Sequence, residues 1–179
     1  PNDLPGSVRR LYCNNTPKFA KKAVKIATVS EYSKTDIIAN YGVSPEKIDV
    51  VYSGANDKLR PVDDSVKHSI RLQFSEGNPY FVFVGSLHPR KNLANLFRAF
   101  DKFCIDNKTL TYNLLIVGER RWWTPAIQEA YNSMAYQQRV KFTGRVSNEN
   151  LWKIVASASV LTYVSNFEGF GVPIMEDFK

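Results

Sequence analysis

Disulfide-rich and metal-binding proteins need several cysteines or histidines, and this sequence of 179 residues has only two of each. Cys13 and Cys104 lie far apart, so a single disulfide is conceivable but a disulfide framework is not. The ligand spacing of a structural zinc site is absent as well. We therefore predict two reduced thiols and no bound metal.

Long apolar runs are absent too. None approaches the roughly 18 residues that a membrane-spanning helix needs. The segment PNDLPGSVRR (1–10) has neither an initiator methionine nor the apolar core of a signal peptide. We expect a cytoplasmic protein whose sequence is cut at both ends, and we leave open peripheral attachment of the full-length protein to the inner face of a membrane.

Acidic residues are the less common charged type. The 24 lysines and arginines exceed the 17 aspartates and glutamates, which gives a net charge of +7. Such an excess suits anionic partners, among them nucleic acids, acidic membranes and phosphorylated small molecules. The basic residues are scattered except in KFAKKAVK (18–25), which we interpret as the solvated face of a helix rather than as a nucleic-acid site.

The second half of the sequence contains a regular alternation of β-rich and helical stretches. Short runs of aromatic and β-branched residues predict buried strands, and stretches with apolar residues at helical spacing lie between them. The predicted strands are 80–85, 113–118, 140–144 and 160–165, and the predicted helices are 92–104, 124–138 and 147–159. Because strand and helix alternate without hairpin signals, we predict an α/β fold with a doubly wound parallel sheet.

The first half predicts two more short strands, at 25–30 and 47–55, with a helix between them. Ser30 is a suitable N-cap for that helix, and Gly42 is a suitable residue to end it. A polar stretch follows and holds a short predicted helix around 65–74. The residues up to about position 15 show no clear period and are interpreted as a loop or as part of a preceding domain.

In a doubly wound sheet, ligands bind beyond the carboxyl ends of the strands. The first such end is VGSLHPRKN (84–92), where Gly85 lets the chain leave its strand and Arg90 and Lys91 precede a helix. A helix N-terminus attracts anions, and a guanidinium and an ammonium beside it suit a phosphate or diphosphate. The alternative is that both cations are solvated charges on a loop.

Two further strand ends carry weaker signals. In VGERRWW (117–123), Arg120 and Arg121 either face a ligand or are surface arginines beside a packed tryptophan pair. In FTGRVSNENL (142–151), Gly144 either permits close backbone approach to a planar base or serves a plain strand-to-helix turn.

The last strand end, NFEGFGVPIMED (166–177), supplies two carboxylates. Glu168 and Glu176 stand eight positions apart across a turn in which Gly169 and Gly171 permit sharp bending. Pro173 suits the first position of a helix. Carboxylates that accept hydrogen bonds from neighbouring hydroxyl groups hold sugar rings and ribose, although acids in the first turn of a helix also serve the helix dipole alone.

Together, the motifs VGSLHPRKN and EGFGVPIME resemble those of the retaining, nucleotide-sugar-dependent glycosyltransferases of family 4, which have the two-domain GT-B fold. TVSEYSKTDIIANYGVSPEKIDVVYSGAN is similar to the stretch where such chains pass from the N-terminal to the C-terminal domain. The resemblance covers roughly residues 15–179. It implies that residues 1–45 are the end of an N-terminal domain and the interdomain segment. Residues 46–179 would form a nucleotide-sugar donor-binding domain, the Rossmann-like C-terminal half of the fold, incomplete at its C-terminus.

The resemblance also implies roles for residues of this chain. Arg90 and Lys91 would hold the donor diphosphate and stabilise the leaving group, and Glu168 would contact the transferred sugar, so these three are the candidate catalytic residues. Glu176 would hold the ribose of the nucleotide. The full set of candidate donor-binding residues is Gly85, Arg90, Lys91, Gly144, Glu168, Gly169, Phe170, Gly171 and Glu176.

A hexosyltransferase of this kind is expected to move a sugar with retention from a UDP- or GDP-linked donor to a saccharide or lipid-linked acceptor, without a metal or cofactor. Family habit suggests bacterial polysaccharide or lipopolysaccharide assembly. The acceptor would bind to the N-terminal domain, whose usual glycine-rich loop is missing here. The chain ends three residues after Glu176. We therefore predict that residues 1–179 alone transfer no sugar.

Other classes fit less well. A nucleotide-sugar epimerase, a glycan phosphorylase of the same fold and a nucleotide-sugar-binding module stay as alternatives, although the residues typical of the first two are not recognisable. A dinucleotide-binding oxidoreductase needs G-x-G-x-x-G at a strand end, and neither VGSLHP nor VGERRW has it. A nucleic-acid-binding module needs basic residues interleaved with exposed aromatics, whereas the aromatics here mostly fall on core periods.

Overall fold

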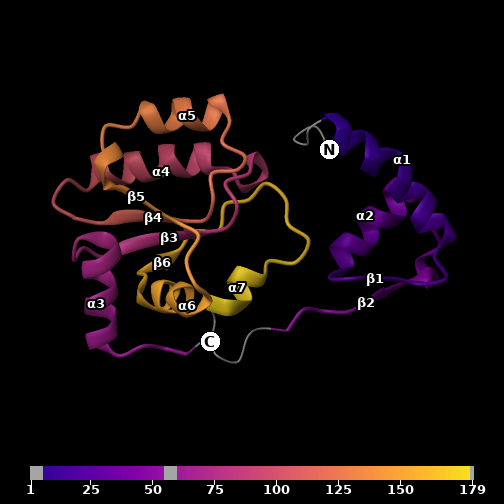
Figure 1. The fold of residues 1–179 in the computed structure, drawn as a ribbon, viewed down its shortest axis with the longest axis horizontal. Helices are drawn as coiled ribbons and strands as arrows, with labels where there is room; N and C mark the ends of the chain where they lie inside the picture. The colour runs from indigo at the N-terminus through magenta and orange to yellow at the C-terminus, as the bar shows by residue number, and fades with distance from the viewer. Residues whose placement is uncertain (1–5, 55–59, 178–179) are drawn as a thin grey trace. The chain divides into compact units, whose positions relative to one another are not determined.

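The computed structural model describes residues 6–54 and 60–177, with side chains as far as residue 174, and Figure 1 shows its elements. The chain divides into two compact units. The smaller unit holds residues 1–55 and 168–172, and the larger unit holds residues 56–167 and 173–179. This division lies downstream of the predicted one between residues 45 and 46, and the assignment of the two parts to an N-terminal and a donor-binding domain stays a prediction.

A parallel four-stranded sheet in the order β5-β4-β3-β6 forms the centre of the larger unit. Its strands are β3 (Tyr80–Val84), β4 (Asn113–Val117), β5 (Val140–Gly144) and β6 (Val160–Leu161). Each lies within a predicted strand, and all pairings are parallel. The α/β fold with a parallel sheet is therefore confirmed.

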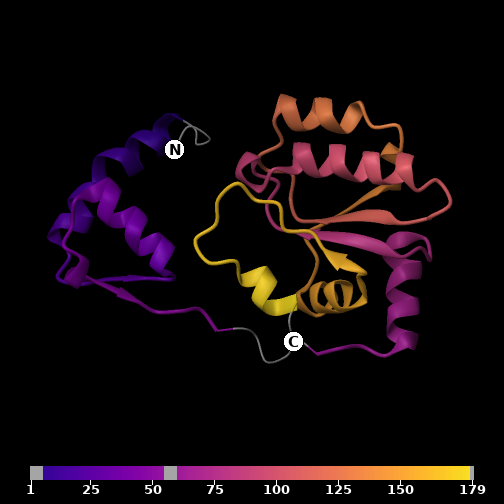
Figure 2. The ribbon, with the colours of Figure 1, turned by 180° about the vertical axis from the view of Figure 1, so that it is seen from behind.

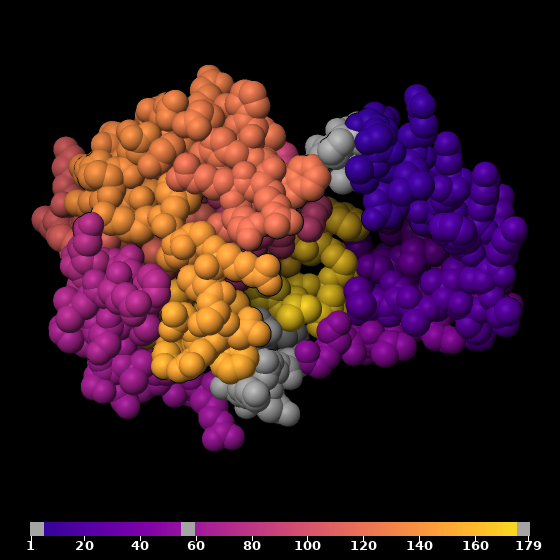
Figure 3. All heavy atoms as spheres, viewed as in Figure 1, coloured from indigo at the N-terminus to yellow at the C-terminus, as the bar shows by residue number. Residues whose placement is uncertain are grey.

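Helices cover both faces of this sheet. α4 (Leu93–Asp106) and α5 (Pro125–Asn132) lie on one face, and α3 (Asp64–Ser75) and α6 (Asn148–Ser157) lie on the other, as two opposite views show (Figures 1 and 2). In the space-filling view, side chains occupy the spaces that the ribbons leave between the layers of this unit (Figure 3). The sheet is thus covered on both sides, as the doubly wound prediction requires.

The period-two pattern of β3 explains why the larger unit has two cores. Phe81 and Phe83 pack in the cluster that includes residues of α4 and α5, whereas Tyr80 and Val82 pack in the cluster that includes residues of α3 and α6. Successive side chains of a strand point to opposite faces, so both sets become buried. This is why the strand appears in the sequence as an unbroken apolar run.

The smaller unit contains α1 (Gly6–Lys22), β1 (Ile26–Thr28), α2 (Glu31–Tyr41), the 3-10 helix η1 (Pro45–Lys47) and β2 (Ile48–Val50). β1 and β2 pair in parallel. The apolar core of this unit is small, since the buried residues of its hydrophobic cluster are Ala20, Val43 and Ile48. The predicted caps of α2 are confirmed: Ser30 Oγ accepts from the backbone N–H of Ser33, and Gly42 is left-handed with a φ of 61°.

Of the two interpretations of the residues up to about position 15, the loop is wrong, because helix α1 begins at Gly6, and the interpretation as part of a preceding domain stays a prediction. Ala20 is the buried residue of α1, so no broad apolar stripe marks the helix in the sequence. The basic cluster at 18–25 was interpreted as the solvated face of a helix. This holds for Lys18, Lys21 and Lys22, which are exposed on α1, whereas the helix ends before Lys25.

The predicted helix at 124–138 ends early, because α5 stops at Asn132. Asp101 of α4 supplies the physical reason: its carboxylate accepts hydrogen bonds from the backbone N–H groups of Ala135 (3.1 Å) and Tyr136 (2.8 Å). These amides bind a side chain instead of continuing the helix. The short 3-10 helix η3 (Gln137–Arg139) follows.

Three predicted strands are also shorter than expected, among them β1, which spans Ile26–Thr28 instead of residues 25–30. β2 ends at Val50 instead of residue 55, and β6 ends at Leu161 instead of residue 165. The N–H of Thr162 still donates to Val82 O at 2.7 Å, but β6 pairs with β3 alone. Beyond Thr162 the chain binds the loop after β3, as described below.

Both cysteines are free; Cys13 is exposed and Cys104 is buried. Within residues 6–54 and 60–177, no helix has the length and apolar character to cross a bilayer. In the same part of the chain, no three His, Cys, Asp or Glu side chains are grouped so that they could hold a metal ion.

Candidate functional site

Three glycines lie in a row at the carboxyl edge of the sheet. The N–H of Gly85 donates to Val117 O (2.9 Å), and the N–H of Gly118 donates to Gly144 O (3.0 Å). A Cβ at Gly118 would lie 1.9 Å from the carbonyl oxygen of Gly85, so only glycine fits there. Gly144, with a φ of 67°, has no heavy atom within 4 Å of its Cβ position. The backbone at this edge is therefore tight between β3 and β4 and open at the end of β5.

The loop from β3 to α4 carries both predicted cations. It contains the 3-10 helix η2 (Pro89–Lys91), which His88 caps by accepting the backbone N–H of Arg90 on Nδ1 (3.1 Å). Lys91 extends back to the strand end, because a Cβ at Gly85 would lie 3.7 Å from its Nζ. This contact places Lys91 next to Gly85, and the prediction that both residues bind a donor stays a prediction.

The segment after β6 binds directly to this loop. Asn92 Nδ2 donates to Val164 O (3.1 Å), and the backbone N–H of Asn166 donates to Arg90 O (2.9 Å). Arg90 itself donates from Nη1 to Phe167 O at 2.6 Å. The loop thus holds the chain up to the residue before Glu168.

The aromatic ring of Tyr163 lies next to the same cations. Lys91 Nζ is 5.8 Å from the centroid of this ring. An ammonium within about 6 Å of an aromatic face is attracted by the ring quadrupole. This contact and the packing against Gly85 restrict where the charge of Lys91 can lie.

Residues 168–172 belong to the smaller unit. The Gly169 carbonyl accepts hydrogen bonds from Ser30 Oγ (2.5 Å) and Ser33 Oγ (3.2 Å), and the Phe170 ring lies 6.1 Å from that of Tyr52. Glu168 is half-buried.

The two glycines of this turn differ in their conformations. Gly171 is buried and left-handed with a φ of 97°, as expected from the sequence, whereas the φ of Gly169 is not positive. A Cβ on Gly169 would meet Ser33 Oγ at 3.4 Å and Val29 Cγ2 at 3.5 Å. These are ordinary contact distances, so Gly169 packs against the start of α2 without a left-handed conformation.

The structure therefore brings Gly85, Arg90 and Lys91 together in the larger unit, with Gly144 in the same row of strand ends. It assigns Glu168, Gly169, Phe170 and Gly171 to the smaller unit. The backbone of Glu176 lies in the short helix α7 (Val172–Asp177), and its side chain lies outside the described part of the chain. The convergence of all these residues on one donor stays a prediction.

The arginines of VGERRWW make other contacts. The guanidinium of Arg120 lies 3.8 Å from the ring centroid of Phe142 and 4.8 Å from that of Trp123. Arg121 forms an ion pair with Glu119 at 2.5 Å. These contacts favour the interpretation of the two residues as surface arginines beside packed aromatics.

Sequence reasoning missed several residues of this region: His88, Asn92, Tyr163 and Ser33. Of these, His88 and Asn92 stand inside the quoted motif and could have been noticed as capping types. Tyr163 and Ser33 act on partners far away in the sequence, so no local pattern marks them. Ser30 was predicted as a helix cap, but its bond to Gly169 was not.

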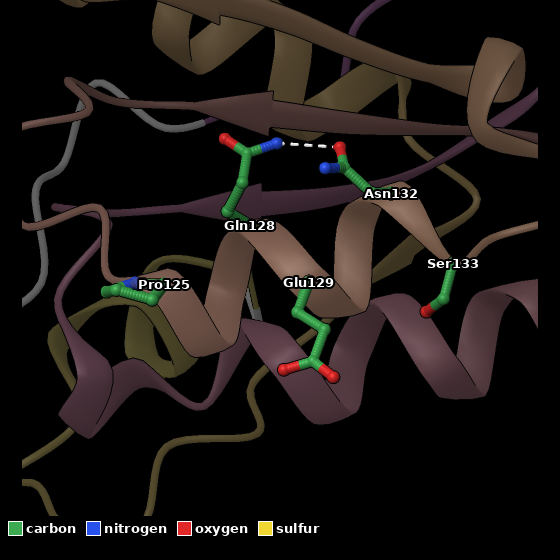
Figure 4. Close-up of a pocket in the computed structure, with 5 residues that line it drawn as sticks. All are labelled: Pro125, Gln128, Glu129, Asn132 and Ser133. Carbon is green, nitrogen blue, oxygen red and sulfur yellow. Dashed lines mark hydrogen bonds between the residues drawn. The ribbon is translucent and has the colours of Figure 1, made fainter.

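A shallow depression lies on the outer side of α5, away from the strand ends (Figure 4). Gln128 Nε2 donates to Asn132 Oδ1 (2.7 Å), and Gln128 Oε1 accepts from Trp123 Nε1 (2.7 Å). The residues that line the depression are Pro125, Gln128, Glu129, Asn132 and Ser133. None of these five carries a positive charge, so the depression does not suit a diphosphate.

Comparison with protein families gives a match over residues 65–179 to the model described as Glycosyl transferases group 1. The O-antigen chain mannosyltransferase RfbU of Salmonella typhimurium is 31% identical over 173 residues, which cover 94% of this chain and 44% of that protein. The O-antigen chain mannosyltransferase B of Escherichia coli is 24% identical over 152 residues, covering 84% of this chain and 40% of that protein.

Among solved structures, HepE from Anabaena, in complex with UDP and glucose, superposes with a TM-score of 0.78. It is 21% identical, and the match covers 99% of this chain and 47% of that one. At 21% identity, this structural similarity is evidence for the fold alone. The chain spans less than half the length of these three proteins.

Proposed function

The chain belongs to the glycosyl transferases group 1 family, and from that premise we propose that it carries the donor-binding part of a sugar-transferring enzyme. The donor is a nucleoside-diphosphate sugar, linked to UDP or GDP, and the acceptor is a saccharide or a lipid-linked saccharide. The proposed reaction uses neither a metal ion nor a cofactor. It includes a cytoplasmic location at the inner face of a membrane, where a lipid-linked acceptor would lie.

The observation that carries the proposal is the position of Lys91. Its ammonium packs against Gly85 at the end of the central strand β3, and Lys91 follows Arg90 in the short 3-10 helix that precedes α4. Positive side chains and the N-terminus of a helix favour anions at one place. A diphosphate with two neighbouring phosphoryl groups matches such a pair of cations better than a single carboxylate does.

In the reaction that we propose, the bond between the anomeric carbon of the sugar and the diphosphate oxygen breaks. The electron pair stays on the diphosphate, while an acceptor hydroxyl oxygen bonds to the anomeric carbon and releases its proton. Negative charge therefore grows on the leaving group, where Arg90 and Lys91 stabilise it. Glu168 accepts hydrogen bonds from hydroxyls of the transferred sugar, and Glu176 does so from the ribose.

The finer features of the proposal come from the resemblance to family 4 and from the relatives. We propose that the sugar keeps its anomeric configuration, and that it is mannose, since RfbU and mannosyltransferase B are O-antigen mannosyltransferases by name. NMR of the product formed by the full-length protein tests both points, because its signals identify the sugar and the one-bond coupling between the anomeric carbon and its proton differs between α- and β-mannosides. An inverted linkage contradicts retention.

A thermal-shift panel tests donor binding by the chain itself. We expect UDP or GDP and the corresponding sugar to raise the melting temperature, whereas NAD and a single-stranded oligonucleotide at physiological salt do not. Arg90→Ala should reduce the shift for the diphosphate, and Arg98→Ala, on the exposed side of α4, should not. A preferred nucleotide whose shift ignores Arg90→Ala would contradict the site assignment.

Transfer by the chain is a separate question. Since the chain spans less than half of its relatives, we propose that residues 1–179 alone bind a donor but transfer no sugar. A radiolabelled donor with a saccharide acceptor measures this directly. Turnover above the rate of hydrolysis would show that the acceptor site is contained in the chain.

A further inference from the structure

We propose that Ser30 and Ser33 are positioning residues for the turn at residues 168–172. Their hydroxyl groups hold the Gly169 carbonyl and so fix the backbone that presents Glu168 to the donor sugar. Both serines and the turn belong to the same unit. The inference rests on the proposed function, because the serines have this role only if Glu168 contacts the donor.

The hydrogen-bond geometry allows both serines to bind one oxygen. Ser30 Oγ lies 2.5 Å and Ser33 Oγ 3.2 Å from Gly169 O. A carbonyl oxygen has two lone pairs, and each hydroxyl has one proton to donate. Ser30 Oγ can still accept the N–H of Ser33 (3.0 Å) as the cap of α2. All three bonds can therefore exist at once.

Capping of α2 does not account for this arrangement. Ser30 alone satisfies the backbone N–H of Ser33, and a cap needs no second hydroxyl. The hydroxyl of Ser33 instead bonds to Gly169, 136 positions later in the chain. The Ser33 hydroxyl also lies 3.1 Å from Ser30 Oγ, so it connects the cap of α2 to the turn at 168–172.

The turn is seated closely on the N-terminus of α2. The Cβ position of Gly169 lies 3.4 Å from Ser33 Oγ and 3.5 Å from Val29 Cγ2, which are ordinary contact distances, so the turn packs directly against the start of α2. The next residue, Phe170, lies with its ring 6.1 Å from the ring of Tyr52. Hydrogen bonds and packing therefore hold consecutive residues of the turn.

Glu168 stands between two held carbonyl groups. Phe167 O, immediately before it, accepts from Arg90 Nη1, and Gly169 O, immediately after it, accepts from the serines. The direction of a side chain follows from the backbone that carries it. Loss of the serine bonds therefore frees the Glu168 carboxylate to move, which weakens contacts with the sugar but not with the diphosphate.

The test measures the affinity of the chain for GDP and GDP-mannose, and for UDP and UDP-glucose, by calorimetric titration. The ratio of the two affinities within a pair reports the contribution of the sugar. Ser33→Ala removes a donor without removing the cap, and Ser30→Asp keeps an acceptor for the cap but has no hydroxyl proton. Ser30→Thr keeps both functions. Ser69→Ala is the matched control, because its hydroxyl donates to Ser65 O within α3.

We expect Ser33→Ala and Ser30→Asp to lower this ratio by about threefold to tenfold, the range that corresponds to one hydrogen bond. Affinity for the diphosphate alone should not change, and Ser30→Thr and Ser69→Ala should match the wild type. Hydrogen exchange provides a second readout: the amides of residues 169–171 should exchange faster in Ser33→Ala while those of α2 stay protected.

Glu168→Gln separates failure of the inference from failure of the proposed function. If Glu168→Gln lowers the ratio and both serine variants leave it unchanged, the inference is overturned and the function stands. If Glu168→Gln leaves the ratio unchanged, the role of Glu168 is wrong and the inference fails with it. If Ser33→Ala weakened the affinity for the nucleoside diphosphate and for the nucleotide sugar by the same factor, the inference would also be overturned. The serine would then contribute to general stability.

Discussion

Tyr80 ties the amino end of β3 to helix α6 by one buried hydrogen bond. Its hydroxyl donates to Ile154 O at 2.6 Å, and the side chain is fully buried. Burial, the largest influence, raises the pKa of Tyr80, and the charge of Arg71 lowers it by less. The folded protein therefore favours the neutral phenol.

This shift predicts a loss of stability in alkali. In the unfolded chain the phenol loses its proton near pH 10, whereas in the folded protein it keeps it at higher pH. The unfolded state then binds fewer protons, so stability falls as pH rises above about 10. Tyr80→Phe should reduce this fall, and at pH 7 it should cost about 1–2 kcal/mol through the lost bond. Urea unfolding at pH 7 and above pH 10 measures both effects.

The control is Tyr12→Phe, which changes an exposed tyrosine. This variant should have the same free energy of unfolding as the wild type at pH 7, and that free energy should fall above pH 10 as steeply as in the wild type. An alkaline decline that is the same in Tyr80→Phe and in the wild type would show that Tyr80 does not titrate as proposed.

Single residues also show what the sequence could not reveal. Arg90 and Lys91 were noticed because a cation pair before a helix is a local pattern, and their role as an anion site stays a prediction. That Arg90 also binds the Phe167 carbonyl was not predictable, since the partner is a backbone atom of no particular residue type. Gly169 was noticed for the conformational freedom of glycine, but its φ is not positive, and its contact with Ser33 could not be foreseen from the local sequence.

At the scale of elements, the loop between β3 and α4 organises the end of β6. Asn92 begins α4 in a left-handed conformation with a φ of 61°, and its Nδ2 donates to Val164 O. The left-handed conformation suits asparagine better than most residues other than glycine. One side chain thus combines a backbone requirement with a contact to the segment that leads to Glu168.

Two substitutions separate these two roles of Asn92. Asn92→Gly keeps the left-handed conformation and loses the side-chain bond, so the amide of Asn166 should exchange faster with solvent while global stability changes little. Asn92→Ala loses the bond and also strains the backbone, which should cost about 1–2 kcal/mol more. Hydrogen exchange and urea unfolding measure the two effects. Unchanged exchange at Asn166 in both variants would contradict the role of the loop.

Most elements of the larger unit were predictable, because strands buried on both faces and amphipathic helices leave clear patterns. The errors fall where a tertiary contact decides an element's end. α5 stops where Asp101 binds the next backbone amides, and β6 stops where Arg90 and Asn92 bind the chain. α1 was missed because it buries little and so has no strong period.

At the scale of the whole molecule, the two units have unequal cores. The smaller unit buries Ala20, Val43 and Ile48, whereas the two clusters of the larger unit together bury many large apolar residues. Stabilisation by apolar burial grows with the area removed from water. The smaller unit should therefore open at a lower denaturant concentration than the larger one.

The thiol of Cys104 reports opening of the larger unit. It is buried, and burial raises its pKa, so a thiol reagent should modify it only after that unit unfolds. We expect the amides of α2 to lose exchange protection at a urea concentration below that at which Cys104 becomes reactive. Cys13→Ser removes the exposed thiol and leaves one reporter. Coincident midpoints for the two probes would show that the units unfold together.

The family and the α/β fold were within reach of the sequence, because they depend on local motifs and on repeated alternation. The membership of residues 168–172 in the smaller unit was not, since it depends on Ser30, Ser33 and Tyr52, which are remote in the chain. The candidate site was therefore predicted as a set of residues, and its supporting contacts were found only in the structure.

The central claim is that cations at the end of β3 bind the diphosphate of a nucleotide sugar. Calorimetric titration of the chain with the preferred nucleoside diphosphate, comparing Lys91→Ala with Lys102→Ala, tests it most directly. Lys102 is an exposed lysine of α4 that pairs with Asp106. The account predicts binding at least about tenfold weaker in Lys91→Ala, as expected for a lost charge-assisted hydrogen bond, and unchanged in Lys102→Ala. Equal affinity for the wild type and Lys91→Ala would contradict it.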